Sequence, residues 1–422
     1  MVTVLKICSL ACFTVLFLAA TVTPGFQVNN RRTAEGTDFE FHLPTGLSKA
    51  SWRRRIPLDN PMTPAKVALG EALYFDKRLS IDGTVSCATC HDPANAFTDH
   101  GTVAIGVSTK TGTRNAPTIL NAMFSERLFW DGRAGSLEEQ AKQPLTNSFE
   151  MGMGDNNAVV ARVKIQAEYR KRFGEVFGRE GITIDTIAKA IAAYERTQLS
   201  ANSPFDRFIS GEPNAITEAQ KRGWELFKGK AKCIECHSFS IASPFFTDFK
   251  FHNTGVVAKD INFEHLTGLA KQVADNERVN SQNKPINGMS HKTGSGQTQD
   301  SAPLLAHTRG FTELGRYLVT KERKDIGSFK TPTLRDIELT TPYMHNGSEK
   351  TLLDVVRFYN RGGNANANLE ERMRPLNLND EELNQLVEFM RALTSDDVLQ
   401  QSQRATPQTR KPVRVNPLLT KQ

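Results

Sequence analysis

Apolar residues recur at helical spacing in two distant parts of the chain. In the first part, Ile184, Ile187 and Ile191 follow one another at intervals of three or four, and the stripe continues to Leu199. The second part has the same rhythm at Leu383, Leu386, Val387, Met390 and Leu393. Each stripe predicts an amphipathic helix with one face in a core. Alternation typical of strands is scarce, so we predict an all-α fold with long loops.

Two further helices are predicted from their start signals. Thr63 followed by Pro64 is typical of an N-cap and a first helical residue. Thr217, with Gln220 three residues later, indicates a capping box. Both segments then carry the pattern Gly-x-x-Leu-aromatic, at residues 70–74 and 223–227. This diverged repeat predicts two similar helical domains.

Changes in composition set the predicted boundaries. We expect one domain over residues 24–200 and the other over 201–397, with the junction near Ala201-Asn202-Ser203-Pro204. Residues 275–303 are rich in Asn, Gln, Ser, Lys and Gly, which predicts a solvated insertion loop. Residues 398–422 are polar and basic, which predicts a disordered tail.

The N-terminus has the pattern of a secretory signal peptide. Lys6 precedes an apolar run of 14 residues, from Ile7 to Ala20, which then breaks at a Thr-Val-Thr-Pro-Gly sequence. A membrane-spanning helix needs about 20 apolar residues. We therefore predict that residues 1–23 are a signal peptide that is removed. The protein is then expected to be periplasmic or otherwise exported and to have no transmembrane anchor after processing.

Charge is unevenly distributed along the 422 residues. The formal net charge of +7 comprises +4 in residues 1–56 and +5 in residues 398–422, so the residues between them carry −2. Because the body of the chain is slightly acidic, we discount nucleic acid as a partner.

Two segments, Cys87-Ala88-Thr89-Cys90-His91 and Cys233-Ile234-Glu235-Cys236-His237, carry the chemistry that the sequence predicts most strongly. Both have the form C-x-x-C-H, the attachment signature of c-type haem. Two thiols at this spacing can add to the two vinyl groups of one porphyrin, and the adjacent histidine then lies beneath the iron as its proximal ligand.

A zinc site and a pair of disulfides are the alternatives. The C-x-x-C pairs of a zinc ribbon lie about 15–20 residues apart, whereas 142 residues separate Cys90 from Cys233. Disulfides would not need a histidine after each pair. We therefore predict two covalently bound haems c, one in each of two cytochrome-c-like domains.

These two motifs and four others, in the same order, resemble the bacterial di-haem cytochrome c peroxidase family, which includes the methylamine-utilisation enzyme MauG. The four others are Arg114-Asn115-Ala116-Pro117-Thr118, Phe129-Trp130-Asp131-Gly132-Arg133, Lys330-Thr331-Pro332-Thr333-Leu334-Arg335 and Pro342-Tyr343-Met344-His345-Asn346-Gly347. The likeness covers about residues 55–395.

The resemblance implies a role for each matching residue. His91 would hold a peroxidatic haem in the N-terminal domain, and His237 an electron-transfer haem in the C-terminal domain. Trp130 matches the tryptophan between the haems. The resemblance also implies two residue sets: Gln140, Pro144 and Glu150 over the peroxidatic iron, and Asn115, Thr340 and Pro342 around a calcium ion.

The implied activity is reduction of hydrogen peroxide, with Glu150 as the proton shuttle and Trp130 as the bridge between haems. A small cytochrome c or cupredoxin would donate electrons near the C-terminal haem. A MauG-like enzyme would instead oxidise a partner protein or another substrate. A di-haem electron carrier without peroxidase activity and a haem-based sensor are the other candidates, and pairing of two chains as a homodimer is left open. A distal acid argues against the carrier.

The distal side of the first haem departs from many family peroxidases, in which a loop histidine blocks the iron at rest. Val107 stands at the matching position, and valine cannot coordinate iron. We therefore predict an open peroxidatic haem. The alternative is that a displaced loop brings His100 to the iron.

Two residues compete as the sixth ligand of the His237 haem. Met344 offers a thioether, a common axial ligand. The family's methionine lies fourteen residues beyond the histidine of the last motif, and that position after His345 is Tyr359, as in the MauG branch. Tyr359 also continues an apolar helical stripe with Leu352 and Val356, but a ligand and a core residue share one face where the haem is the core. We favour Tyr359.

Overall fold

The predicted helix starts are present in the structure, a computed structural model that describes residues 43–256, 261–282, 305–308 and 310–404. Helix α2 (Pro64–Tyr74) begins after Thr63, whose hydroxyl accepts the backbone N–H of Lys66. Helix α9 (Glu218–Lys228) begins with the expected reciprocal bonds between Thr217 and Gln220. The signal peptide predicted for residues 1–23 lies outside the described residues.

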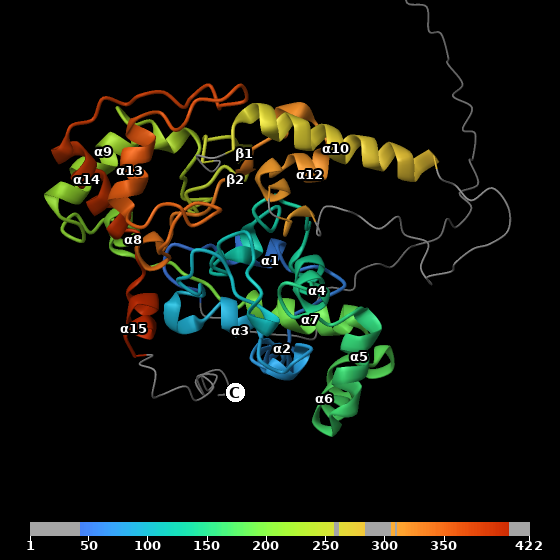
Figure 1. Ribbon diagram of the computed structural model, residues 1–422. Coiled ribbons are helices and arrows are strands. Elements are labelled where there is room, and N and C mark those ends of the chain that lie inside the picture. The colour runs from blue at the N-terminus through green and yellow to red at the C-terminus, as the bar shows by residue number, and fades with distance from the viewer. Residues whose placement is uncertain (1–42, 257–260, 283–304, 309, 405–422) are drawn as a thin grey trace, which may run out of the picture. The chain divides into compact units, whose positions relative to one another are not determined.

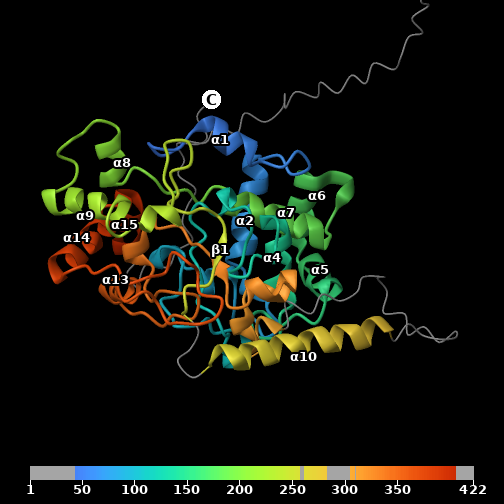
Figure 2. The same ribbon diagram turned by 90° about the horizontal axis from the view of Figure 1, so that it is seen from above.

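Helices dominate the fold, and long loops connect them (Figures 1 and 2). The helices not yet named are α1 (Lys49–Arg54), α3 (Cys87–Cys90), α4 (Leu137–Thr146), α5 (Asn156–Ile165), α6 (Ala167–Phe177), α7 (Ile184–Glu195), α8 (Pro204–Ile209), α10 (Phe263–Gln282), α12 (Tyr317–Thr320), α13 (Leu352–Asn360), α14 (Asp380–Arg391) and α15 (Asp396–Arg404). Strands β1 (Phe251–His252) and β2 (Phe329–Lys330) pair antiparallel, with Phe251 opposite Lys330. The all-α prediction is confirmed, and none of the described helices is both long and apolar enough to cross a membrane.

The repeated Gly-x-x-Leu-aromatic pattern creates two close helix crossings. Helix α2 meets α7 at Gly70, where an added Cβ would lie 1.9 Å from the carbonyl oxygen of Ala190. Helix α9 meets α14 at Gly223, where it would lie 2.0 Å from the carbonyl oxygen of Gln385. Only glycine allows the backbones to approach so closely. The repeat in the sequence is therefore a repeat in packing.

Substitution of Gly223 by alanine is expected to lower the free energy of unfolding by about 1–3 kcal/mol, the usual range for overpacking a tight contact. The added methyl would meet backbone atoms of α14, which cannot rotate away. Thermal unfolding of the haem-loaded protein, followed by circular dichroism, measures the effect. Gly174→Ala on α6 is the matched control, because its Cβ would meet nothing within 4 Å. That variant should be unchanged or slightly more stable, and equal losses in both would contradict the crossing.

Each crossing belongs to its own hydrophobic cluster. The first cluster includes Leu73 on α2, Leu145 on α4 and Ile191 on α7. The second includes Phe227 on α9 and Phe389 on α14. Helix α4 packs on α7 as α13 packs on α14, so the two halves share one three-helix arrangement.

Several boundaries differ from the sequence predictions. Helix α10 continues to Gln282, so residues 275–282 are helical rather than loop, while residues 283–303 of the predicted insertion lie outside the described residues. Helix α15 likewise occupies the start of the predicted tail up to Arg404. Leu199 lies beyond α7, which ends at Glu195. Residues 275–282 and 399–404 are mostly polar, so composition alone predicted a loop and a tail where the structure has the ends of helices.

Candidate functional site

The two C-x-x-C-H segments form short helical turns that present their thiols beside a histidine. Cys87 and Cys90 begin and end α3, and His91 caps it. Cys233 opens a single 3-10 turn before His237. All four thiols are free and half-buried. Each segment thus offers the two thiols and one imidazole that covalent haem attachment needs.

Backbone carbonyls fix the orientation of both histidines. Nδ1 of His91 lies 3.3 Å from the carbonyl oxygen of Phe97, and Nδ1 of His237 lies 2.9 Å from that of Phe246. Burial lowers the pKa of each imidazole, so both are neutral at neutral pH. With Nδ1–H donating to a carbonyl, the lone pair of Nε2 is free to bind a metal.

Sequence reasoning missed the residues that supply these carbonyls. Phe97 and Phe246 each adopt a left-handed backbone, with φ of 60° and 52°. Each begins a Phe-Thr-Asp triplet, at residues 97–99 and 246–248. This short repeat after the two attachment motifs was the available signal. It extends the internal repeat from helix packing to the support of the histidines.

A large cavity opens beside the second motif. Together with the solvent space at its mouth it encloses about 2070 Å³. Its walls include Cys233, Cys236 and His237 of the second motif as well as Trp130 and Lys330. Burial lowers the pKa of the Lys330 amine to about 8, and no carboxylate in the described part of the chain offsets its charge.

The donor set of this cavity fits a haem. Two thiols and an imidazole line it, most of the remaining lining is apolar, and the half-buried Lys330 ammonium is a cation that a propionate would neutralise. The metal-ligand grouping of Cys236, Asp248 and His252 in the same region is less suited to a separate metal ion. His252 is already held on both ring nitrogens, by Asp248 at 2.8 Å and Glu370 at 2.7 Å.

Both candidate sixth ligands line this cavity, but they occupy different kinds of backbone. Tyr359 lies on α13 and lines the cavity together with Cys233 and Cys236. Burial raises the pKa of its phenol well above the usual range. Met344 lies in the loop before α13, with φ of +71°.

The internal repeat relates Tyr359 to Pro144, one of the residues predicted over the first haem. Ser136 caps α4 and Thr351 caps α13, each through its side chain. Pro144 is the eighth residue after the first cap, and Tyr359 is the eighth residue after the second. The two residues therefore occupy the same turn of corresponding helices. Helix α4 packs against α7, and α13 packs against α14.

Trp130 lies at the junction of the two halves. Its indole N–H donates to the carbonyl oxygen of Asn115 at 2.9 Å, and its ring meets that of His345 edge to face, with centroids 6.4 Å apart. Two backbone hydrogen bonds of 2.8 Å join the halves here. The N–H of Asn115 donates to the carbonyl oxygen of His345, and the N–H of Lys330 donates to that of Trp130. Trp130 thus touches both halves and reaches the cavity of the second.

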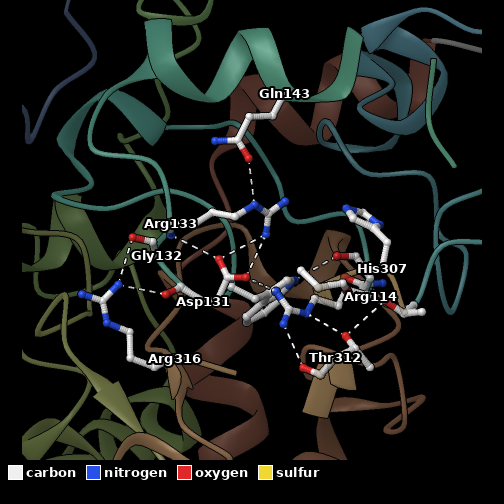
Figure 3. Close-up of polar contacts among 12 residues, drawn as sticks. Arg114, Asp131, Gly132, Arg133, Gln143, His307, Thr312 and Arg316 are labelled. Carbon is white, nitrogen blue, oxygen red and sulfur yellow. Dashed lines mark hydrogen bonds and ion pairs between the residues drawn. The ribbon is translucent and has the colours of Figure 1, made fainter. Parts of the chain in front are cut away.

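A buried network of charges holds the turn that carries Trp130 (Figure 3). Asp131 is fully buried, and its carboxylate receives Arg114 at 2.7 Å and Arg133 at 2.9 Å. Although burial opposes it, these two guanidiniums hold the pKa of Asp131 below its usual value. Arg316 donates to the carbonyl oxygens of Asp131 and Gly132, each at 3.0 Å. The motifs were visible in the sequence, but this pairing between them was not.

The residues predicted over the first haem come from α4 and the loop after it. Gln140 and Pro144 are half-buried on α4, and the Pro144 carbonyl accepts the N–H of Met151 at 3.2 Å. Glu150 precedes Met151, whose hydrophobic cluster Cys87 packs against, and burial together with the charge of Glu150 raises the pKa of the Cys87 and Cys90 thiols. The structure therefore brings Glu150 close to the first motif.

The environment of Glu150 suits proton transfer. Burial raises the pKa of its carboxyl to about 7, against the opposing charge of Arg133. The carbonyl oxygen of Glu150 accepts the N–H of Val107 at 2.8 Å, and the Val107 side chain is buried. An acid with a pKa near neutrality can both take up and release a proton at working pH.

The remaining predicted ligands have mixed placements. Asn115, Thr340 and Pro342 all line the large cavity. The side-chain N–H of Asn115 donates to Gly101 at 2.9 Å, so its amide oxygen is the atom available to a cation. His100 is exposed, and its Nε2 lies 3.0 Å from the carbonyl oxygen of Leu339.

Comparison with known proteins points to one family. The family model for the di-haem cytochrome c peroxidases matches residues 64–214. Cytochrome-c peroxidase IdrP1 of Pseudomonas sp. (strain SCT) is 37% identical, over 82% of this chain and 84% of its own. The methylamine utilization protein MauG of Methylophilus methylotrophus is 34% identical, over 80% and 84%. A crystal structure of a MauG-like protein associated with microbial copper homeostasis aligns with a TM-score of 0.66 at 30% identity, over 85% of this chain and 97% of that one.

Proposed function

Because the chain belongs to the di-haem cytochrome c peroxidase family, and is thus an oxidoreductase with two haem c sites, we propose that it reduces hydrogen peroxide at the N-terminal site with electrons relayed from the C-terminal site. The observation that carries this proposal is Glu150, a half-buried carboxyl whose pKa is raised to about 7 beside the first attachment motif. A pure electron carrier has no use for such an acid.

The haems, when bound, supply the iron at which peroxide is reduced and the store from which electrons come. Reduction of one peroxide to two waters consumes two electrons and two protons. Glu150 takes the proton from one peroxide oxygen and returns it to the other, which becomes water. Gln140 and Pro144, on the adjoining α4, shape the space in which this transfer occurs.

Electron supply is proposed to run through the junction of the two halves. Trp130 contacts Asn115 in the first half and lines the cavity of the second, which supports its role as the bridge. A small cytochrome c or cupredoxin is the proposed donor, docking near the His237 site. We take residues 24–200 and 201–397 as the two haem domains, a division supported in the described part of the chain by the hydrophobic cluster of α2, α4 and α7 and that of α9, α13 and α14.

Steady-state turnover tests this function. The haem-loaded protein is mixed with a reduced small cytochrome c and hydrogen peroxide, and oxidation of the cytochrome is followed by absorbance. We expect two cytochromes oxidised per peroxide, without a requirement for prior reduction, because Val107 leaves no loop ligand to displace. Oxidation no faster than with peroxide alone would favour an electron carrier. Activity only after prior reduction would indicate that a distal ligand blocks the iron at rest, and His100 would be the first candidate for it.

Tyr359 favours a second role within the same family, the oxidation of a partner protein or another substrate. Its position matches that of Pro144, a residue assigned to the distal side of the first haem, which supports Tyr359 over Met344 as the sixth ligand. A phenolate ligand stabilises ferric iron and lowers the potential, which disfavours a high-potential store for cytochrome electrons.

Replacement of Tyr359 by phenylalanine is therefore expected to change the ligation of the His237 haem, whereas Met344→Leu should leave it intact. Paramagnetic resonance of the resting protein reports the spin state and axial ligands of both irons. Loss of the low-spin signal in the Tyr359 variant alone is the expected outcome. The reverse pattern would assign Met344 as the ligand and group the protein with the ordinary cytochrome c peroxidases.

We also propose a calcium ion between the halves and export of the protein. Asn115, Thr340 and Pro342 line one cavity and offer amide and carbonyl oxygens, the ligands that calcium prefers. Export is supported by the signal-peptide pattern and by covalent attachment, which prevents loss of haem outside the cell.

A further inference from the structure

His307 is a buried histidine that none of the recognised motifs contains. It lies in the short described segment 305–308, which Thr113 anchors by donating its hydroxyl to the carbonyl oxygen of Ala306 at 2.8 Å. The imidazole ring is parallel to that of Phe149, with an angle of 11° between planes and centroids 6.2 Å apart. Figure 3 shows His307 beside Arg114 at the edge of the buried charge network. The second half of the chain thus contributes a side chain to the neighbourhood of Glu150.

The ring nitrogens of His307 lack hydrogen bonds. Nε2 lies 3.4 Å from Oε1 of Glu150, within the distance of a long hydrogen bond but without its geometry. Neither ring nitrogen has another hydrogen-bond partner among the described residues, although the side chain is only 11% exposed. A buried polar group without a partner is costly. Catalytic hydrogen bonds are often long in the absence of substrate and shorten when the site is occupied.

The charges around this pair keep the imidazole neutral. Burial, with the charges of Arg133 and Arg114, lowers the pKa of His307 to about 3, while Asp131 opposes them. Arg133 also faces Glu150, and Lys110 lies over the Phe149 ring at 6.0 Å. A neutral imidazole has one donor and one acceptor. It can therefore donate to the Glu150 carboxylate or accept from the protonated acid.

We propose that His307 is a positioning residue for Glu150, holding its carboxyl by a hydrogen bond in both protonation states while the proton moves between the peroxide oxygens. The proposal rests on the proposed function and deepens it by one residue. His307 does not touch the reacting atoms in this account. It acts through the orientation and proton affinity of Glu150.

The test compares His307→Phe with His307→Gln in the haem-loaded protein. Phenylalanine keeps the ring and its packing on Phe149 but removes both nitrogens, whereas glutamine keeps a donor and an acceptor. We expect the phenylalanine variant to lose about 10- to 100-fold in the rate of reaction with peroxide, the usual effect of a hydrogen bond to a charged group. Glutamine should restore most of the rate. His265→Gln, at an exposed position of α10, is the matched control and should change nothing.

Two readouts separate positioning from mere packing. The first is the pH midpoint of the Glu150 carboxyl, measured in two ways. One is the pH dependence of the rate of the peroxide reaction, and the other is the infrared band of the protonated carboxyl, which is assigned to Glu150 by its absence in Glu150→Gln. Both midpoints should move to higher pH in His307→Phe, because the carboxylate loses a donor. The second is the double variant with Glu150→Gln, which should be no slower than Glu150→Gln alone.

An unchanged rate and midpoint in His307→Phe, with normal wild-type turnover, would overturn the role of His307 and leave the proposed function intact. Additive losses in the double variant would also overturn it. A wild-type protein that does not consume peroxide would contradict the proposed function itself. If His307→Phe does not fold, His307→Leu, which also lacks both nitrogens, decides: a higher infrared midpoint supports the hydrogen bond, and a midpoint equal to the wild type contradicts it.

Discussion

Exchange of Glu150 for glutamine is expected to slow peroxide reduction by about 10²- to 10⁴-fold, the range for loss of a positioned acid or base. Glutamine keeps the shape and the hydrogen-bonding capacity of the side chain, but it cannot take a proton from one peroxide oxygen and return it to the other. The loss should appear in kcat as well as in kcat/KM, because the missing interaction belongs to the transition state.

The pH dependence of the wild-type protein gives the same residue a second signature. Burial raises the pKa of Glu150 to about 7. If the carboxylate accepts the first proton, the rate rises as pH increases through about 7 and then levels off. The glutamine variant should lose this step. Glu126→Gln, at an exposed position in the same half, is the control and should keep both the rate and the profile. A full rate in Glu150→Gln would remove the central acid from the mechanism.

Replacement of Asp131 by alanine is expected to reduce the free energy of unfolding by about 3–5 kcal/mol, the usual cost of breaking a buried ion pair. The carboxylate is fully buried between Arg114 and Arg133, which are themselves 8% and 4% exposed. Its removal leaves two buried guanidiniums facing each other without a counter-charge. Asp131→Asn should also be destabilised, because the amide keeps a hydrogen bond but not the charge.

Denaturant unfolding of the haem-loaded variants measures this loss. Glu225→Gln, in an exposed ion pair on α9, is the control and should show no resolvable change. Because the guanidiniums hold the folded pKa of Asp131 below its usual value, its contribution should persist at neutral pH and disappear only as pH falls below the ordinary aspartate range, about 3.9. A neutral effect of Asp131→Ala would mean that the triad does not hold the Trp130 turn.

Helix starts, close helix crossings and the haem attachment motifs could be predicted from the sequence, because each depends on residues that are neighbours in the chain. Thr63 and Thr217 cap helices, as Pro64 after the first and Gln220 three residues after the second indicated, and the glycines at 70 and 223 lie at helix crossings. The attachment motifs contain both thiols and the histidine within five residues, so no tertiary information was needed. The family comparisons confirm the resemblance drawn from these motifs.

Contacts between distant segments were not predictable in this way. Asp131 and Arg114 belong to motifs that the sequence displays, but nothing in either motif indicates that one neutralises the other. His307 has no motif at all, and it reaches Glu150 across more than 150 positions of sequence. The Phe-Thr-Asp repeat is present in the sequence, but the sequence does not show what it does. The structure shows that the phenylalanine carbonyl of each repeat accepts from the histidine of an attachment motif.

The most direct test of the central claim is the reaction of the fully reduced di-haem protein with one equivalent of hydrogen peroxide, followed by rapid-mixing absorbance at wavelengths that report each haem. If the two sites act together, one equivalent of peroxide oxidises both ferrous haems, because its reduction to water takes two electrons. The same protein with Cys233 and Cys236 replaced by serine should release only one electron to peroxide. Oxidation of a single haem in the intact protein, or a second haem that stays reduced until more peroxide is added, would contradict the account.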